Sequence, residues 1–274
     1  MHRKRVITAA ILALASLAVL SKGGHSGEMA FLFMVIAATA LCLREYFAIT
    51  FPCPNAVGRL GIIIGLLPVV CAIINPEPGA IAAGLYLALF SSILIFIPSV
   101  KIWPNPLLNW AAFLMGASYI GLCAAHLVLI RSLEAGREWV FFLFCVIFAG
   151  DVGAYYTGSA VGRHKLCPVL SKGKTIEGAA GGLVSSVIVG SGAGALLFNR
   201  TSPIFIGALA AALGITGQIG DLTESLVKRS FGVKDSGSLL PGHGGIFDRI
   251  DALLMATPMM YWILQLTEKY GLFQ

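Results

Sequence analysis

Hydrophobic residues in this chain fall into long, nearly uninterrupted blocks that short polar segments separate. Each block is long enough for a helix that crosses a bilayer, which takes roughly 20 residues, and the blocks lack the alternation of outer-membrane barrel strands. We therefore predict an all-α, polytopic integral membrane protein. The predicted spans are residues 6–21, 29–47, 59–74, 79–98, 107–130, 139–160, 178–198, 203–223 and 252–268.

The composition supports a membrane protein, with 57% hydrophobic residues, 12% charged residues and a mean hydropathy of +0.87. A water-soluble globule could not easily bury so much apolar surface. The first block follows Arg3-Lys4-Arg5, as in a secretory signal, but Ser21-Lys22-Gly23-Gly24 is a poor cleavage site. We therefore expect this block to remain as a first helix.

The basic residues predict the orientation, because cytoplasmic loops hold an excess of lysine and arginine. With the N-terminus inside, fourteen of the 19 lysines and arginines lie on the cytoplasmic side. The net charge of +6 is then mostly a feature of topology. No soluble basic face is present, so we expect no nucleic-acid partner.

The aspartates indicate how the chain is organised, because all of them follow residue 150. We predict a transmembrane scaffold at 1–138 and a catalytic transmembrane region at 139–274, with cytoplasmic loops at 161–177 and 224–251. Within this region, the segment from Gly178 to Gly194 is rich in glycine, alanine and serine. Small residues let membrane helices approach closely, which favours packing inside the protein over the alternative of a dimer face.

The most informative segment begins near the end of the eighth predicted span. If the helix continues there, Asp221, Ser225 and Lys228 lie on one stripe, at i, i+4 and i+7. The alternative is an interfacial helix end whose basic side chains reach to water. The next loop weakens that alternative, because it adds Lys234-Asp235 and the glycine-rich segment Pro241-Gly242-His243-Gly244-Gly245.

Carboxylates follow this loop at once, with Asp248 and Asp251 three residues apart. Asp221 and Asp248 form a plausible pair of ligands for Mg²⁺, a hard cation that prefers oxygen. Glycine backbone can approach an anion closely, and His243 is expected to contact phosphate or to stabilise the loop. Together these features predict a site for a nucleoside triphosphate.

A second cluster lies upstream. Asp151 falls inside a hydrophobic span, where an acid is a functional candidate by default. Gly173-Lys174-Thr175 suggests a Walker A loop, but Pro168 stands where its first glycine is required, and no strand is expected before it. We therefore reject a P-loop. A positive-inside loop would explain the basic residues of this segment, but neither Asp151 nor Glu177.

These residues resemble the diagnostic motif of phosphatidate cytidylyltransferases. The resemblance is carried by Ser225-x-x-Lys228-Arg229, Lys234-Asp235 and Pro241-x-His243-Gly244-Gly245-x-x-Asp248-Arg249-x-Asp251. The upstream cluster is similar to the same family through Asp151, Gly158, Gly162, Lys165-Leu166, Ser171 and Lys174-Thr175-x-Glu177-Gly178. One departure is Ile176, where the family usually has an aromatic residue.

The resemblance implies that CTP and phosphatidic acid react to CDP-diacylglycerol and pyrophosphate. It implies Mg²⁺ as cofactor, held by Asp221 and Asp248, and leaves open a second, monovalent ion. It further implies a multi-pass homodimer among the lipids of the bacterial inner membrane, with its site facing the cytoplasm. The catalytic residues expected are Lys228, Arg229, Lys234, Asp235, His243, Arg249 and Asp251. The residues expected to bind substrate are Ser225, Gly244, Gly245, Lys174, Thr175, Glu177, Asp151 and Arg163.

Two other functions stay open at this point. A CTP-dependent polyprenol or lipid kinase would use a similar site but would transfer the γ-phosphoryl group. An ion-coupled transporter could use Asp151 and Asp221 as ion sites, although no pair of broken helices repeats between the two halves of the chain.

Overall fold

The structure is a computed structural model that describes residues 24–51, 56–98, 100–199, 201–237, 239 and 244–270. The predicted span 6–21 lies outside the described residues. The chain divides into two compact units. Unit 1 comprises Met1–Ser132 and Phe231–Arg249, and unit 2 comprises Leu133–Ser230 and Ile250–Gln274. The segment Phe231–Arg249 therefore groups with the N-terminal helices.

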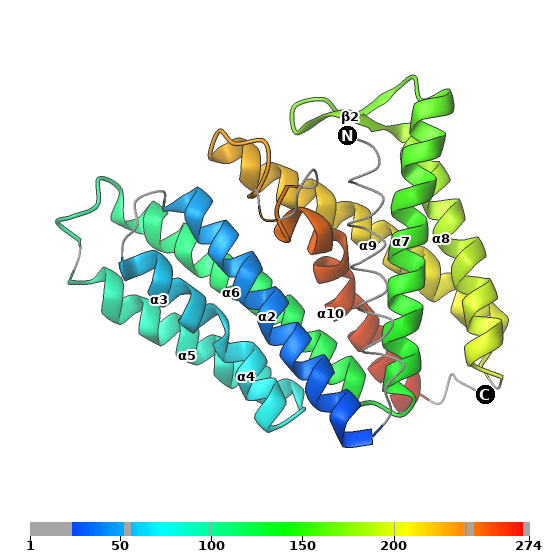
Figure 1. The fold of residues 1–274 in the computed structure, drawn as a ribbon, viewed down its shortest axis with the longest axis horizontal. Coiled ribbons are helices and arrows are strands. Elements are labelled where there is room, and N and C mark those ends of the chain that lie inside the picture. Colours follow the sequence, from blue (N-terminus) through cyan, green and yellow to red (C-terminus); the bar gives the residue numbers. More distant parts are fainter. Residues whose placement is uncertain are drawn as a thin grey trace. The chain divides into compact units, whose positions relative to one another are not determined.

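In its described part, unit 1 is a bundle of three membrane-length helices and two shorter ones that follow each other directly (Figure 1). Its helices are α2 (Gly24–Thr50), α3 (Ala56–Gly65), α4 (Leu67–Ile74), α5 (Pro78–Phe96) and α6 (Pro106–Ser132). Helix α6 packs against each of the others in this set. The predicted span 59–74 is interrupted between α3 and α4, because Pro68 at the start of α4 cannot donate a helical hydrogen bond.

Unit 2 carries a small β-hairpin between two long helices. Its elements are α7 (Gly136–Val161), β1 (Lys165–Cys167), β2 (Ser171–Thr175), α8 (Ile176–Leu197), α9 (Pro203–Ser230) and all but the first residues of α10 (Phe247–Lys269). Helices α7 and α8 run side by side, and the hairpin lies at one end of this pair (Figure 1). The hairpin connects the C-terminal end of α7 to the N-terminal end of α8.

Small residues explain the close contact between α7, α8 and α9. The buried residues of α8 are Gly178, Gly182, Ser186, Gly190 and Gly194, one on each turn. A Cβ atom added at Gly182 would lie 2.8 Å from the carbonyl oxygen of Gly150, and one added at Gly190 would lie 2.5 Å from the Cβ of Ala210. These small residues of α8 therefore pack against α7 and α9 inside unit 2, which confirms the predicted role in packing.

The fold class predicted from the sequence is confirmed. Among the described residues, seven helical segments are long and apolar enough to cross a membrane: α2, α3 with α4, α5, α6, α7, α8 and α9. The ninth predicted span forms helix α10, which is not one of these seven. The expectation that no strand precedes Gly173 was wrong, because β1 does and Gly173 itself lies in β2. The N-inside orientation stays a prediction.

Candidate active site

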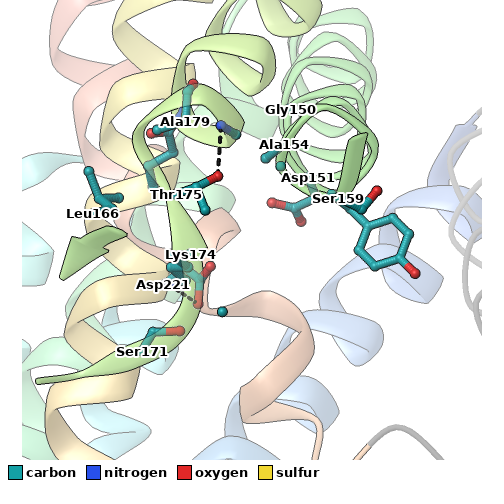
Figure 2. Close-up of a pocket in the computed structure, with 15 residues that line it drawn as sticks. Gly150, Asp151, Ala154, Ser159, Leu166, Ser171, Lys174, Thr175, Ala179 and Asp221 are labelled. Carbon is teal, nitrogen blue, oxygen red and sulfur yellow. Dashed lines mark hydrogen bonds and ion pairs between the residues drawn. The ribbon is translucent and has the colours of Figure 1, made fainter. Parts of the chain in front are cut away.

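A pocket of about 470 Å³ opens in unit 2 at the level of the hairpin (Figure 2). Its size falls within the roughly 300–1,000 Å³ of small-molecule sites. Helices α7, α8 and α9 and the hairpin all contribute to its wall. The lining residues are Gly150, Asp151, Ala154, Tyr155, Gly158, Ser159, Leu166, Ser171, Gly173, Lys174, Thr175, Gly178, Ala179, Gln218 and Asp221.

Thr175 fixes the point where the hairpin becomes helix α8. It is the N-cap residue of α8, and its Oγ1 accepts a hydrogen bond of 3.1 Å from the backbone N–H of Gly178. Such caps stabilise a helix start by about 1 kcal/mol. A Cβ atom added at Gly162 or Gly178 would come within 3 Å of that oxygen. The glycines of this segment therefore make room for the buried Thr175 side chain.

The pocket holds an ion pair between the hairpin and α9. Lys174 Nζ lies 2.7 Å from Asp221 Oδ1, and the two side chains are 24% and 40% exposed. Figure 2 shows the Asp151 carboxylate directed into the same pocket from α7. Asp151 and Lys174 of the predicted upstream cluster thus share this pocket with Asp221, the first residue of the downstream segment.

Asp221 also belongs to a second group of charged side chains in unit 2. Asp221, Glu224 and Asp251 each offer a carboxylate oxygen, and these atoms all lie within 4.8 Å of one another. Glu224 is 1% exposed, and its Oε2 lies 2.6 Å from Nζ of Lys228, one turn later in α9. Burial raises the pKa of Asp251 well above its ordinary value, and the charges of Asp221 and Glu224 add to the rise.

This donor set fits a divalent cation. Its ligand atoms are all carboxylate oxygens, which hard ions such as Mg²⁺ prefer over nitrogen or sulfur. A cation near Asp251 would also favour the ionised form that burial opposes. The backbone is built for the approach, because a Cβ atom added at Gly220 would lie 2.5 Å from the carbonyl oxygen of Asp251. Asp251 was predicted as a catalytic residue, and Glu224 was not among the predicted site residues.

Other predicted residues of unit 2 contact the hairpin. Glu177 accepts hydrogen bonds from the backbone N–H groups of Arg163 (3.1 Å) and His164 (3.2 Å), and it lies 2.6 Å from Nδ1 of His164. Arg229 donates from Nε to the carbonyl oxygen of Leu170, at 3.2 Å. Arg163 and Arg229 are exposed. The Glu177 carboxylate therefore holds the backbone that leads into the hairpin, and the Arg229 side chain holds the turn between its two strands.

Gly244 and Gly245, the described part of the glycine-rich segment, lie in unit 1 together with Asp248. Asp248 Oδ2 accepts hydrogen bonds from the backbone N–H of Ser236 (2.9 Å), from Ser236 Oγ (2.8 Å) and from the backbone N–H of Gly245 (2.8 Å). Gly244 has a φ of +78°, a left-handed conformation that glycine adopts without strain. Lys234, Asp235 and Arg249 are exposed.

The remaining predicted residues can be placed briefly. Ser225 is buried in α9 at 7% exposure, while His243 lies outside the described residues. The pairing of Asp221 with Asp248 at one metal ion stays a prediction. Glu45, in α2, was missed, although it contacts the loop directly through Phe247 and Ser236. The signal that singled out Asp151, an acid inside a hydrophobic block, was also present at Glu45.

Comparison with known proteins decides the family. A model of the cytidylyltransferase family matches residues 3–267. The chain belongs to this family. The match extends over both units, so the resemblance carried by the motif residues is confirmed, as is the expectation of a nucleotidyltransferase.

Named relatives within the family align over nearly the whole chain. A phosphatidate cytidylyltransferase of Bacillus subtilis is 30% identical over 275 residues, covering 96% of this chain and 98% of the relative. Enzymes of the same name from Staphylococcus saprophyticus and Staphylococcus aureus (strain COL) are 34% and 33% identical, and each alignment covers 95% of this chain and 98% of the relative.

Proposed function

We propose that this cytidylyltransferase-family protein transfers the cytidylyl group of CTP to phosphatidic acid, giving CDP-diacylglycerol and pyrophosphate. The observation that carries the proposal is the pocket of unit 2, where Lys174 and Asp221 meet beside a cluster of carboxylates. A site with cations and carboxylates suits a polyphosphate and its counter-ion. Relatives named phosphatidate cytidylyltransferase, at 30–34% identity, support the same reaction.

The chemistry needs positioning more than proton transfer. A phosphatidate oxygen is already anionic, so it can attack the α-phosphorus of CTP without a strong base. The new O–P bond forms as the bond to the β-phosphate oxygen breaks, and pyrophosphate leaves with that electron pair. The chain contributes oriented cations that hold substrate and offset the charge of the leaving group. Lys174, Lys228, Arg229 and Lys234 are the proposed cations, and Asp151 and Arg163 are proposed to contact substrate.

We propose Mg²⁺ as the cofactor. The carboxylates of Asp221, Glu224 and Asp251 fit such an ion, and the sequence motif adds Asp248 as a ligand. When bound, Mg²⁺ would supply Lewis-acid stabilisation of the phosphate oxygens. The neighbouring lysines would orient the carboxylates, as Lys228 does for the buried Glu224, whose Oε2 lies 2.6 Å from Lys228 Nζ.

The location and assembly are also proposals. The apolar helices make this a membrane protein. We propose the bacterial inner membrane, with the pocket open to the cytoplasm where CTP is available, because the predicted orientation places most lysines and arginines on that side. A homodimer is proposed from the family resemblance alone.

Position-specific labelling of CTP tests the reaction. The purified protein is given phosphatidic acid and CTP labelled at either the α- or the γ-phosphorus, in detergent with Mg²⁺. We expect the α-label in the lipid product and the γ-label in pyrophosphate. Transfer of the γ-label to lipid, with CDP released, would instead identify a lipid kinase. Ion flux in liposomes with no labelled lipid would indicate a transporter. The same preparation carrying Asp221→Asn is the control for contaminating activity.

A further inference from the structure

Glu45 lies in a membrane-length helix. Its carboxylate accepts hydrogen bonds from a segment about two hundred residues further along the chain. Its side chain lies in α2 and is 8% exposed. Oε1 accepts a hydrogen bond of 3.0 Å from the backbone N–H of Ile246, and Oε2 accepts one of 2.9 Å from that of Phe247. These N–H groups lie at the start of α10, where a helix has no partners of its own for them.

The surrounding packing holds this contact in place. Phe247 is fully buried, with its ring 6.3 Å from that of Tyr46 and 6.5 Å from that of Tyr119. A Cβ atom added at Gly245 would collide with Glu45 Oε2 and with Ser236 Oγ. The glycine therefore lets the carboxylate reach the backbone. Both the polar and the apolar contacts fix the same short segment.

Ser236 connects Glu45 to Asp248. Its Oγ lies 3.0 Å from Glu45 Oε2 and 2.8 Å from Asp248 Oδ2, within hydrogen-bond distance of both. Asp248 Oδ2 also accepts from the backbone N–H of Ser236 and of Gly245, next to the residues that Glu45 binds. The two carboxylates thus share one hydroxyl and order the backbone on both sides of it. A shift of Glu45 must move the donors of Asp248.

We infer that Glu45 is a positioning residue for Asp248, which it orients through Ser236 and the backbone of Gly245 to Phe247. The inference rests on the proposed function, because the motif gives Asp248 its metal-binding role. Ligating carboxylates are themselves held by hydrogen bonds, and loss of such a partner typically weakens metal affinity or activity by roughly 10- to 100-fold. Within unit 1, the N-terminal helices then supply a positioning residue for Asp248 as well as a scaffold.

The test compares Glu45→Gln with Glu28→Gln. Glu28 lies on the same helix and is exposed, so its variant makes the same change of charge away from the loop. The amide introduced by Glu45→Gln presents a donor where the native carboxylate only accepts. We expect backbone amides in the segment 244–248 to exchange faster with deuterium in Glu45→Gln. We also expect Mn²⁺ alone, followed by electron paramagnetic resonance without nucleotide, to bind about 10-fold more weakly.

A second variant covers the case in which Glu45→Gln does not fold. Ser236→Ala removes the shared hydroxyl and leaves both carboxylates. It should weaken Mn²⁺ binding in the same direction, and the double variant should lose less than the product of the single effects, since both act on Asp248. Glu28→Gln should behave as the unchanged protein in each measurement.

The outcomes separate the inference from the proposed function. If the unchanged protein makes CDP-diacylglycerol but Glu45→Gln and Ser236→Ala keep its Mg²⁺ requirement and its Mn²⁺ affinity, the positioning role is wrong and the reaction stands. If the unchanged protein makes no CDP-diacylglycerol, the proposed function fails and Mn²⁺ affinity alone decides the inference. Equal Mn²⁺ binding by Glu45→Gln and Glu28→Gln, or no binding by any of the proteins, overturns it.

Discussion

Replacing Lys228 by methionine should destabilise the protein strongly, because it removes the partner of a buried acid. Lys228 Nζ lies 2.6 Å from Glu224 Oε2, and the two side chains are 12% and 1% exposed. At an effective dielectric constant of about 20, a pair at this distance attracts by about 6 kcal/mol, before the cost of taking both groups out of water. Methionine keeps the length of the side chain and loses the charge.

The remaining carboxylate determines the size of the effect. Glu224 would stay buried with oxygens of Asp221 and Asp251 within 4.8 Å, so its ionised form would face like charges. Removing one partner of a buried pair typically costs roughly 3–5 kcal/mol. With about 2–4 °C per kcal/mol for chains of comparable size, the melting temperature should fall by about 6–20 °C.

The assay is thermal unfolding of the purified protein in detergent without divalent ions, followed by tryptophan fluorescence at one scan rate, since membrane proteins often unfold irreversibly. Glu224→Gln and the double variant complete a mutant cycle. The double variant should regain most of the loss, because it removes the buried charge together with its partner. A double variant as unstable as Lys228→Met would refute the reasoning. A normal melting temperature with lost activity would favour the sequence-based role of Lys228 as a substrate ligand.

Further predictions concern the glycines and the motif acid. Gly244→Ala should cost more stability than Gly232→Ala. Both glycines have positive φ, so each alanine adds about 1–2 kcal/mol of strain, but only at position 244 would a Cβ meet the Asp248 carboxylate, at 2.5 Å. Gly190→Ala should lower the free energy of unfolding by about 1–3 kcal/mol, whereas Gly192→Ala, which faces open space, should be close to neutral in the same melts. Asp248→Asn should abolish Mg²⁺-dependent formation of CDP-diacylglycerol while the protein remains membrane-inserted, and comparable activity would remove the metal assignment.

The helices could be predicted because a bilayer imposes their length. Blocks of apolar residues marked most of the observed helices to within a few residues, and the continuation of α9 through Lys228 confirms the predicted stripe. The hairpin was missed because Lys165–Cys167 and Ser171–Thr175 are short and polar, without the alternation that marks a strand. Its shape depends on the helices that it joins, which a local pattern does not contain.

Contacts between side chains far apart in the chain could not be predicted from the sequence. Asp221 and Lys174 were each predicted as site residues, but their ion pair joins positions 47 residues apart through the packing of α8 on α9. The sequence places Glu224 on the same predicted helix as Asp221. Its burial and its contact with Lys228 are set by tertiary packing, which the sequence pattern does not contain. Spacing identifies residue types suited to phosphate and metal, whereas the partners come from tertiary structure.

The glycines of the motif show where this limit lies. A glycine-rich loop among charges indicates that backbone approaches an anion closely, and the sequence favoured a substrate phosphate. In the structure the N–H of Gly245 donates to Asp248, and the space beside Gly245 is taken by Glu45. Upstream, Gly162 and Gly178 likewise make room for the Thr175 hydroxyl. In both places the glycines bring the backbone to a side chain of the protein itself. The motif therefore orders acids of the protein itself, and contact between phosphate and the exposed Arg229 and Lys234 stays a proposal.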